Sequence, residues 1–175
     1  MRWIAFIILI YVATVFQTTV APFVAIHGVR PDVLIIIGVY YALMAARYDA
    51  FLAAWSIGLL VDLTSVGYRV HSNVGVCAVA YSIAAMMIVG LREYTFRDTP
   101  VAHVLYCFGA KLVVSAVVIA HMSAVGNASV PIGGTVALAL WEASYTAILA
   151  PYVCWILKRL QPGLGLTGSR RLLHN

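Results

Sequence analysis

The sequence predicts an all-α integral membrane protein, a bundle of six transmembrane helices. Of its 175 residues, 63% are hydrophobic and only 10% are charged, and the mean hydropathy is +0.98. Soluble domains are about 45–50% apolar and about 25% charged, so this chain has too few polar side chains to cover its own surface. One membrane crossing takes about 20 apolar residues, which leaves room for roughly six crossings. This composition excludes an ATPase, a Rossmann domain or a nucleic-acid-binding module.

Apolar runs interrupted by charged residues, Pro or Gly mark the six helices. In chain order they are Trp3–Ile26, Pro31–Ala46, Ala50–Ser65, Ser72–Gly90, Pro100–His121 and Ile132–Leu157. The first is longer than the apolar core of a signal peptide, so we expect a retained helix. The second and third would rise only about 24 Å, less than a hydrocarbon core of about 30 Å. They end inside a protected bundle, thin the membrane or form a re-entrant pair.

The basic residues divide unequally between the two ends of these helices. Alternating helices place Arg2, Arg47, Arg92, Arg97, Lys158, Arg159, Arg170 and Arg171 on one side, and Arg30 and Arg69 on the other. Basic residues accumulate in cytoplasmic loops, so the sequence predicts a multi-pass protein with both termini in the cytoplasm. Residues 1–160 are expected to form one six-helix transmembrane domain, and residues 161–175 a short basic cytoplasmic tail.

Two charged residues fall at similar depths in the fifth and sixth helices. Lys111 and Glu142 each lie about ten residues from the outer end of their helix, or about 15 Å. A charge facing lipid at this depth costs several kcal/mol, so an intramembrane ion pair is the favoured interpretation. Ion or proton translocation is an alternative. Lys111 and Ser115 also share a helical face, as a Ser–Lys nucleophilic pair would, but Glu142 would keep Lys111 protonated.

No metal, cofactor or disulfide is predicted. Cys77, Cys107 and Cys154 lie in apolar runs without the spacing of a metal site or a disulfide framework. His103 and His121 share a helical face but are about 27 Å apart, too far to bind one metal ion.

A second polar group is expected at the outer ends of the second and third helices. It contains Arg30, Asp32, Asp62, Arg69, His71 and Asn73. The acids and arginines can neutralise one another, with Asp32 near the positive N-terminus of the second helix. In the functional interpretation, the second and third helices and their outer ends bind a partner or a ligand through this cluster, together with Pro31 and Gly58. Asp32 and Asp62 are then exposed at the outer rim as determinants of recognition.

Small residues predict where helices approach closely. Gly75, Ala78, Ser82 and Ala85 follow helical spacing in the fourth helix, and Ala139, Ala143 and Ala147 do so in the sixth. Such faces permit close helix packing in membranes. We favour contacts within the bundle over contacts with a partner's helix.

The sequence resembles those of the MreD family, which are rod shape-determining membrane proteins of bacteria. The resemblance is densest where Arg30, Pro31 and Asp32 open an apolar helix and Arg47 ends it. It continues through Gly58 and Asp62 in the run Gly-Leu-Leu-Val-Asp-Leu-Thr-Ser, followed by Gly67 and Asn73. It extends more loosely through six helices to Lys158 and Arg159.

The resemblance implies a non-enzymatic scaffold of the cell-elongation machinery in the bacterial cytoplasmic (inner) membrane. It implies binding to an MreC-like bitopic protein. Through it, the chain would connect to an actin-like MreB filament, a RodA-like glycosyltransferase and a penicillin-binding transpeptidase. The family is also thought to share its six-helix architecture with the substrate-binding components of energy-coupling-factor transporters. The alternative function is therefore a vitamin-binding transporter subunit, in which the outer cluster would line the pocket.

Overall fold

The computed structural model describes residues 2–20, 23–25, 29–65, 75–93, 99–125 and 132–164. Within these ranges the chain forms six α-helices, which confirms the all-α prediction for the described residues. They are α1 (Trp3–Thr19), α2 (Val33–Met44), α3 (Arg47–Ser65), α4 (Val76–Leu91), α5 (Pro100–Ala124) and α6 (Ile132–Leu164). The first helix ends seven residues before the predicted Ile26.

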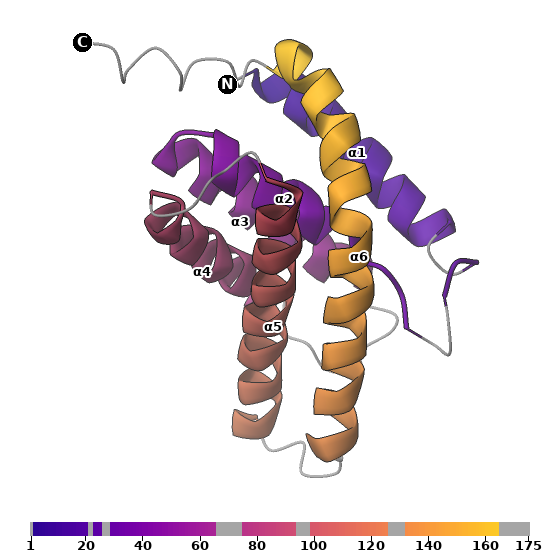
Figure 1. Cartoon of the computed structure of the whole chain (residues 1–175). Coiled ribbons are helices and arrows are strands. Elements are labelled where there is room, and N and C mark those ends of the chain that lie inside the picture. Colours follow the sequence, from indigo (N-terminus) through magenta and orange to yellow (C-terminus); the bar gives the residue numbers. More distant parts are fainter. Residues whose placement is uncertain are drawn as a thin grey trace.

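The longest helices, α5 and α6, run side by side and extend beyond the other four (Figure 1). Both are long and apolar enough to cross a membrane, whereas α1, α2 and α4 are shorter apolar helices. Pro100 lies in the first turn of α5, where its missing N–H removes no helical hydrogen bond. α6 continues through Pro151 and Pro162 to Leu164. Residues 161–164, predicted to begin the tail, are therefore helical.

The short helix α2 lies at the centre and contacts each of the other five helices. Ten consecutive residues, from Leu34 to Leu43, are buried. A helix that is apolar on every side is typical of the interior of a bundle. With 12 residues it rises only about 18 Å. Its two cap residues, Asp32 and Ala45, are buried, so both of its ends lie inside the protein.

α3 and α4 approach each other closely at Gly58. A Cβ atom on Gly58 would lie 2.5 Å from the carbonyl oxygen of Cys77 and 2.6 Å from Cα of Ala78. These are backbone atoms, which cannot move aside as a flexible side chain can. On α4, Ala78, Ser82 and Ala85 are buried, as are Ala143 and Ala147 on α6. The small-residue faces therefore serve contacts within the bundle.

We expect Gly58→Ala to lower the free energy of unfolding by about 2–3 kcal/mol, because the added methyl group overpacks the contact between α3 and α4. Gly90→Ala is the matched control, because Gly90 also lies in a helix but has open space around its Cα. That change should be neutral or stabilise by up to about 1 kcal/mol. Denaturation of the purified protein in detergent measures both values, and equal effects would contradict the close contact.

Candidate functional site

Lys111 joins two carboxylates inside the bundle. Its Nζ lies 2.9 Å from Oδ2 of Asp32 and 3.3 Å from Oε2 of Glu142. The structure thus brings Lys111 and Glu142 together, as the sequence predicts. It also adds Asp32, which the sequence places in a separate outer cluster, as the closer partner. Because these charges are shielded from water, removing one partner would leave a charge uncompensated in the interior.

The carboxylate of Asp32 is fully hydrogen-bonded. Oδ1 accepts from Gln17 Nε2 and from the backbone N–H of Ile35, each at 3.2 Å. Oδ2 accepts from the Tyr81 hydroxyl at 3.0 Å and from Lys111 at 2.9 Å. A carboxylate offers about four acceptor positions, so the described donors fill those of Asp32. Asp32 is also the N-cap of α2, where a negative charge faces the positive end of the helix dipole.

Two backbone hydrogen bonds fix the start of α2 to neighbouring helices. The N–H of Asp32 donates to the Thr146 hydroxyl at 3.2 Å, and the N–H of Val33 donates to Oε1 of Gln17 at 2.8 Å. Gln17 thus accepts from α2 with one end of its amide and donates to Asp32 with the other. α1, α2, α4, α5 and α6 all contribute to one polar network, defined here as Gln17, Asp32, Tyr81, Lys111, Glu142 and Thr146.

Sequence reasoning did not identify Gln17, Tyr81 or Thr146 as members of this network. Gln17 could have been predicted, because it carries an amide within an apolar helix and such a group needs hydrogen-bond partners inside the membrane. Thr146 follows Glu142 by four residues and therefore shares its face of α6. Tyr81 gave no such signal, since a tyrosine in an apolar run is ordinary.

Asp62 caps the start of α4. Its carboxylate accepts from the backbone N–H groups of Gly75 at 2.8 Å, Cys77 at 3.1 Å and Ala78 at 3.2 Å. Gly75, with φ +112°, adopts a left-handed conformation that suits glycine. The side chain of Asp62, at the end of α3, therefore satisfies the free donors of the next helix.

Arg92 serves the opposite end of α2. Its Nη1 donates to the carbonyl oxygens of Ala42 at 2.9 Å and Ala45 at 2.6 Å. The last carbonyl groups of a helix lack intrahelical donors, and a cation there also opposes the negative end of the dipole. The sequence identifies Arg92 only as one of the basic residues on the predicted cytoplasmic side, so this role was missed.

Of the predicted outer cluster, the structure describes Arg30, Asp32 and Asp62, and the two acids hold different helix ends, α2 and α4. Asp32 and Asp62 are only 7% and 1% exposed, so the prediction that both acids are exposed at the rim is wrong. Each lies at a helix N-terminus, where backbone donors hold the carboxylate inside. Pro31 is buried beside Asp32, and Gly58 is buried against α4. Arg30 is partly buried, and Arg69, His71 and Asn73 lie outside the described residues.

The remaining predicted groups lie on α5. Ser115 is partly buried one turn after Lys111, whose Nζ is directed to Asp32 and Glu142. His103 is buried and its Nδ1 lies 2.8 Å from the carbonyl oxygen of Thr99. Among the described residues, no group of three His, Cys, Asp or Glu side chains could hold a metal ion. The geometry indicates that the polar network holds five helices in fixed positions relative to one another.

We expect Lys111→Met to lower the free energy of unfolding by about 3–5 kcal/mol, because it leaves two carboxylates without their cation. Adding Asp32→Asn should restore more stability than adding Glu142→Gln, because Asp32 is closer to Lys111 and more buried. Lys158→Met, near the end of α6, is the control and should have a smaller effect. Denaturation in detergent measures all four variants. Greater restoration by Glu142→Gln would show that Asp32 is not the principal partner.

Most of the chain matches a known protein family. A family model described as rod shape-determining protein MreD matches residues 1–161. No curated protein and no solved structure matches. The matched range includes α1 to α5 and all but the last three residues of α6. The chain belongs to the MreD family of rod shape-determining membrane proteins.

Proposed function

We propose that this chain is a non-enzymatic scaffold of the bacterial cell-elongation complex, which crosses the inner membrane six times and binds an MreC-like bitopic protein. The observation that carries the proposal is the family match over residues 1–161. A role in rod shape determination follows from the family. The partner and the number of crossings are our inference.

The caps of α2 and α4 support six crossings despite the short helices. Backbone groups at membrane depth are tolerated only where protein or a water-filled cavity satisfies them. Asp32 and Arg92 satisfy the two ends of α2, and Asp62 satisfies the start of α4. A 12-residue helix can therefore end within the membrane because its neighbours surround it.

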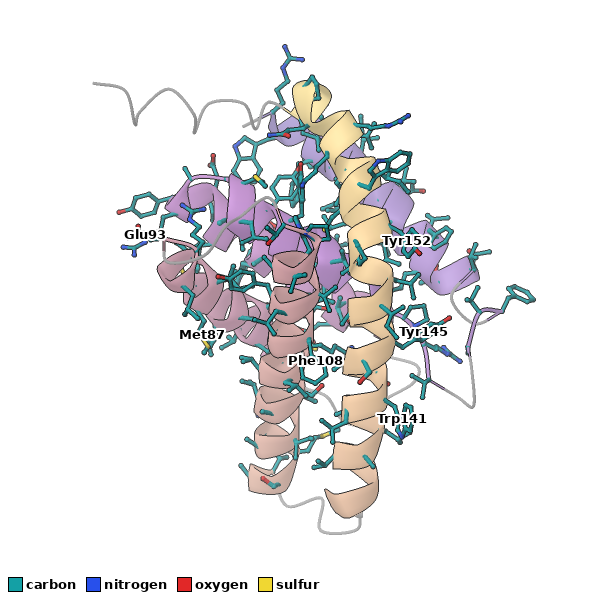
Figure 2. All side chains as sticks on the ribbon, in the orientation of Figure 1. Met87, Glu93, Phe108, Trp141, Tyr145 and Tyr152 are labelled. Carbon is teal, nitrogen blue, oxygen red and sulfur yellow. The ribbon has the colours of Figure 1, made fainter. Side chains whose placement is uncertain are left out.

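The exposed surface also supports a membrane location. α1 exposes Ile4, Ile7, Ile8 and Tyr11, and α6 exposes Trp141, Ile148 and Tyr152. Figure 2 shows Trp141, Tyr145 and Tyr152 projecting from the side of α6 that faces away from α5. Lipid or a partner's helix would cover such side chains, since a soluble protein rarely exposes so much apolar surface.

The partner surface that we propose lies on α3 rather than on α2. α2 is enclosed by the other five helices and so cannot meet a partner. α3 exposes Tyr48, Phe51, Trp55 and Leu63. Through an MreC-like protein bound there, the chain would connect to a RodA-like glycosyltransferase, a penicillin-binding transpeptidase and an MreB filament. This scaffold role needs no nucleophile, cofactor or metal ion.

The transporter alternative draws no support from the cavity between α2, α3, α4 and α5. Small and apolar side chains line it, among them Gly38, Ala54, Ala84 and Ala110, and its volume is about 10 Å³. That is room for about one water molecule. A vitamin ring would not fit there.

We expect both termini and the connection between α4 and α5 to face the cytoplasm, because basic residues gather on that side. In a cysteine-free variant, single cysteines at positions 2 and 93 should resist a membrane-impermeant thiol reagent in intact cells. A cysteine at position 127 should react. Labelling of positions 2 and 93 from outside, with lysed cells as the positive control, would contradict the proposed orientation.

We expect Asp62→Asn to destabilise the fold by about 1–3 kcal/mol, because the carboxylate caps three backbone donors. Since Asp62 is buried, the folded fraction should still co-purify with an MreC-like partner. Glu93→Gln, at an exposed position, is the control for both measurements. Unchanged thermal stability together with lost association would instead make Asp62 a recognition residue.

A further inference from the structure

Glu142 is the least enclosed charge in the polar network. Its side chain is 25% exposed, whereas those of Lys111 and Asp32 are each 10% exposed. Lys111 lies closer to Asp32 than to Glu142. Among the described residues, Glu142 has this one polar contact, whereas Asp32 accepts four hydrogen bonds. Most of the acceptor capacity of Glu142 is therefore unused.

The charges of the network do not balance. It holds two carboxylates, Asp32 and Glu142, and one ammonium group, Lys111. Asp32 also faces the positive end of α2, so the Lys111–Asp32 pair is well compensated. The excess negative charge belongs to Glu142. In an apolar environment, an uncompensated carboxylate attracts a cation strongly.

The surroundings of Glu142 restrict what can carry such a cation. Glu142 lies ten residues after the start of α6 at Ile132, or about 15 Å along the axis. If α6 spans the membrane, as our proposed function holds, this is near mid-depth, beyond the reach of lipid headgroups. The neighbouring side chains Leu138 and Trp141 are 52% and 68% exposed. They offer an apolar surface for a helix, which could bring a basic side chain to this depth.

We propose that Glu142 and the exposed surface of α6 around Leu138 and Trp141 dock a transmembrane helix of a partner protein that carries a lysine or arginine at mid-depth. The partner's cation pairs with Glu142, and its apolar side chains cover Leu138 and Trp141. Charge complementarity gives selectivity among membrane helices that packing alone does not provide. This surface is separate from the α3 face.

Designed helices in vesicles test the docking site. The full-length protein is reconstituted in phosphatidylcholine vesicles with single-span Leu/Ala peptides whose central residue is Lys, Leu or Glu. Association is followed by energy transfer between labelled protein and labelled peptide. The Lys peptide should bind about tenfold more tightly than the Leu peptide, the size expected of one interhelical polar contact. The Glu peptide should bind more weakly than the Leu peptide.

Variants assign the preference to Glu142. Glu142→Gln should bind the Lys and Leu peptides equally, whereas Glu142→Asp should retain part of the preference. Glu93→Gln should behave like the natural protein, because Glu93 is an exposed acid outside the network. Thermal unfolding of each variant verifies that the bundle is intact. Equal binding of the Lys and Leu peptides by the natural protein, or a preference that survives Glu142→Gln, would overturn the proposal.

Cysteine labelling at position 142 tests the membrane-spanning arrangement independently of the docking site. In the cysteine-free variant, Glu142→Cys should give a thiol that is protected from a water-soluble thiol reagent in vesicles. Rapid labelling would place position 142 in water and overturn the membrane-spanning arrangement. Protection without selectivity for the Lys peptide would overturn the docking site alone.

Discussion

The contact between Lys111 on α5 and Asp32 at the start of α2 is the interaction on which the rest of the structure depends. Asp32 also accepts from Tyr81 on α4 and Gln17 on α1, and its backbone donates to Thr146 on α6. Five helices thus meet at one residue, four of them at its carboxylate and α6 at its backbone N–H. Apolar packing between helices tolerates small shifts in register, whereas an ion held by directional hydrogen bonds does not. The network therefore defines the depth at which α2 begins relative to α5 and α6.

A second constraint follows from the length of α2. A helix of about 18 Å leaves free backbone groups at both ends, and in an apolar environment each costs several kcal/mol unless it is paired. Asp32 and Gln17 pair with the start of α2, and Arg92 pairs with its end. Asp62 does the same for α4. The buried charged side chains therefore pair with backbone groups at helix ends as well as with one another.

Composition and apolar runs were enough to predict six helices and most of their bounds, because both properties follow directly from burial in an apolar medium. They also predicted that Lys111 and Glu142 meet, since two opposite charges at one depth have few other partners. The location of Asp32 was not predictable in this way. It precedes α2 in the sequence, so it looked like a residue at the membrane surface. Only the three-dimensional arrangement shows that α2 begins beside the middle of α5.

The same reasoning explains why Asp62 and Gly58 looked functional in the sequence. An acid and a glycine in the segment that most resembles the MreD family suggest a binding surface, but both serve the contact between α3 and α4. Gly58 lets the two backbones approach, and that approach brings the carboxylate of Asp62 within reach of Gly75 and Ala78. A bundle joined by such contacts is well suited to a scaffold. Its interior groups are committed to one another, and the exposed helix faces are left for lipid and for other proteins.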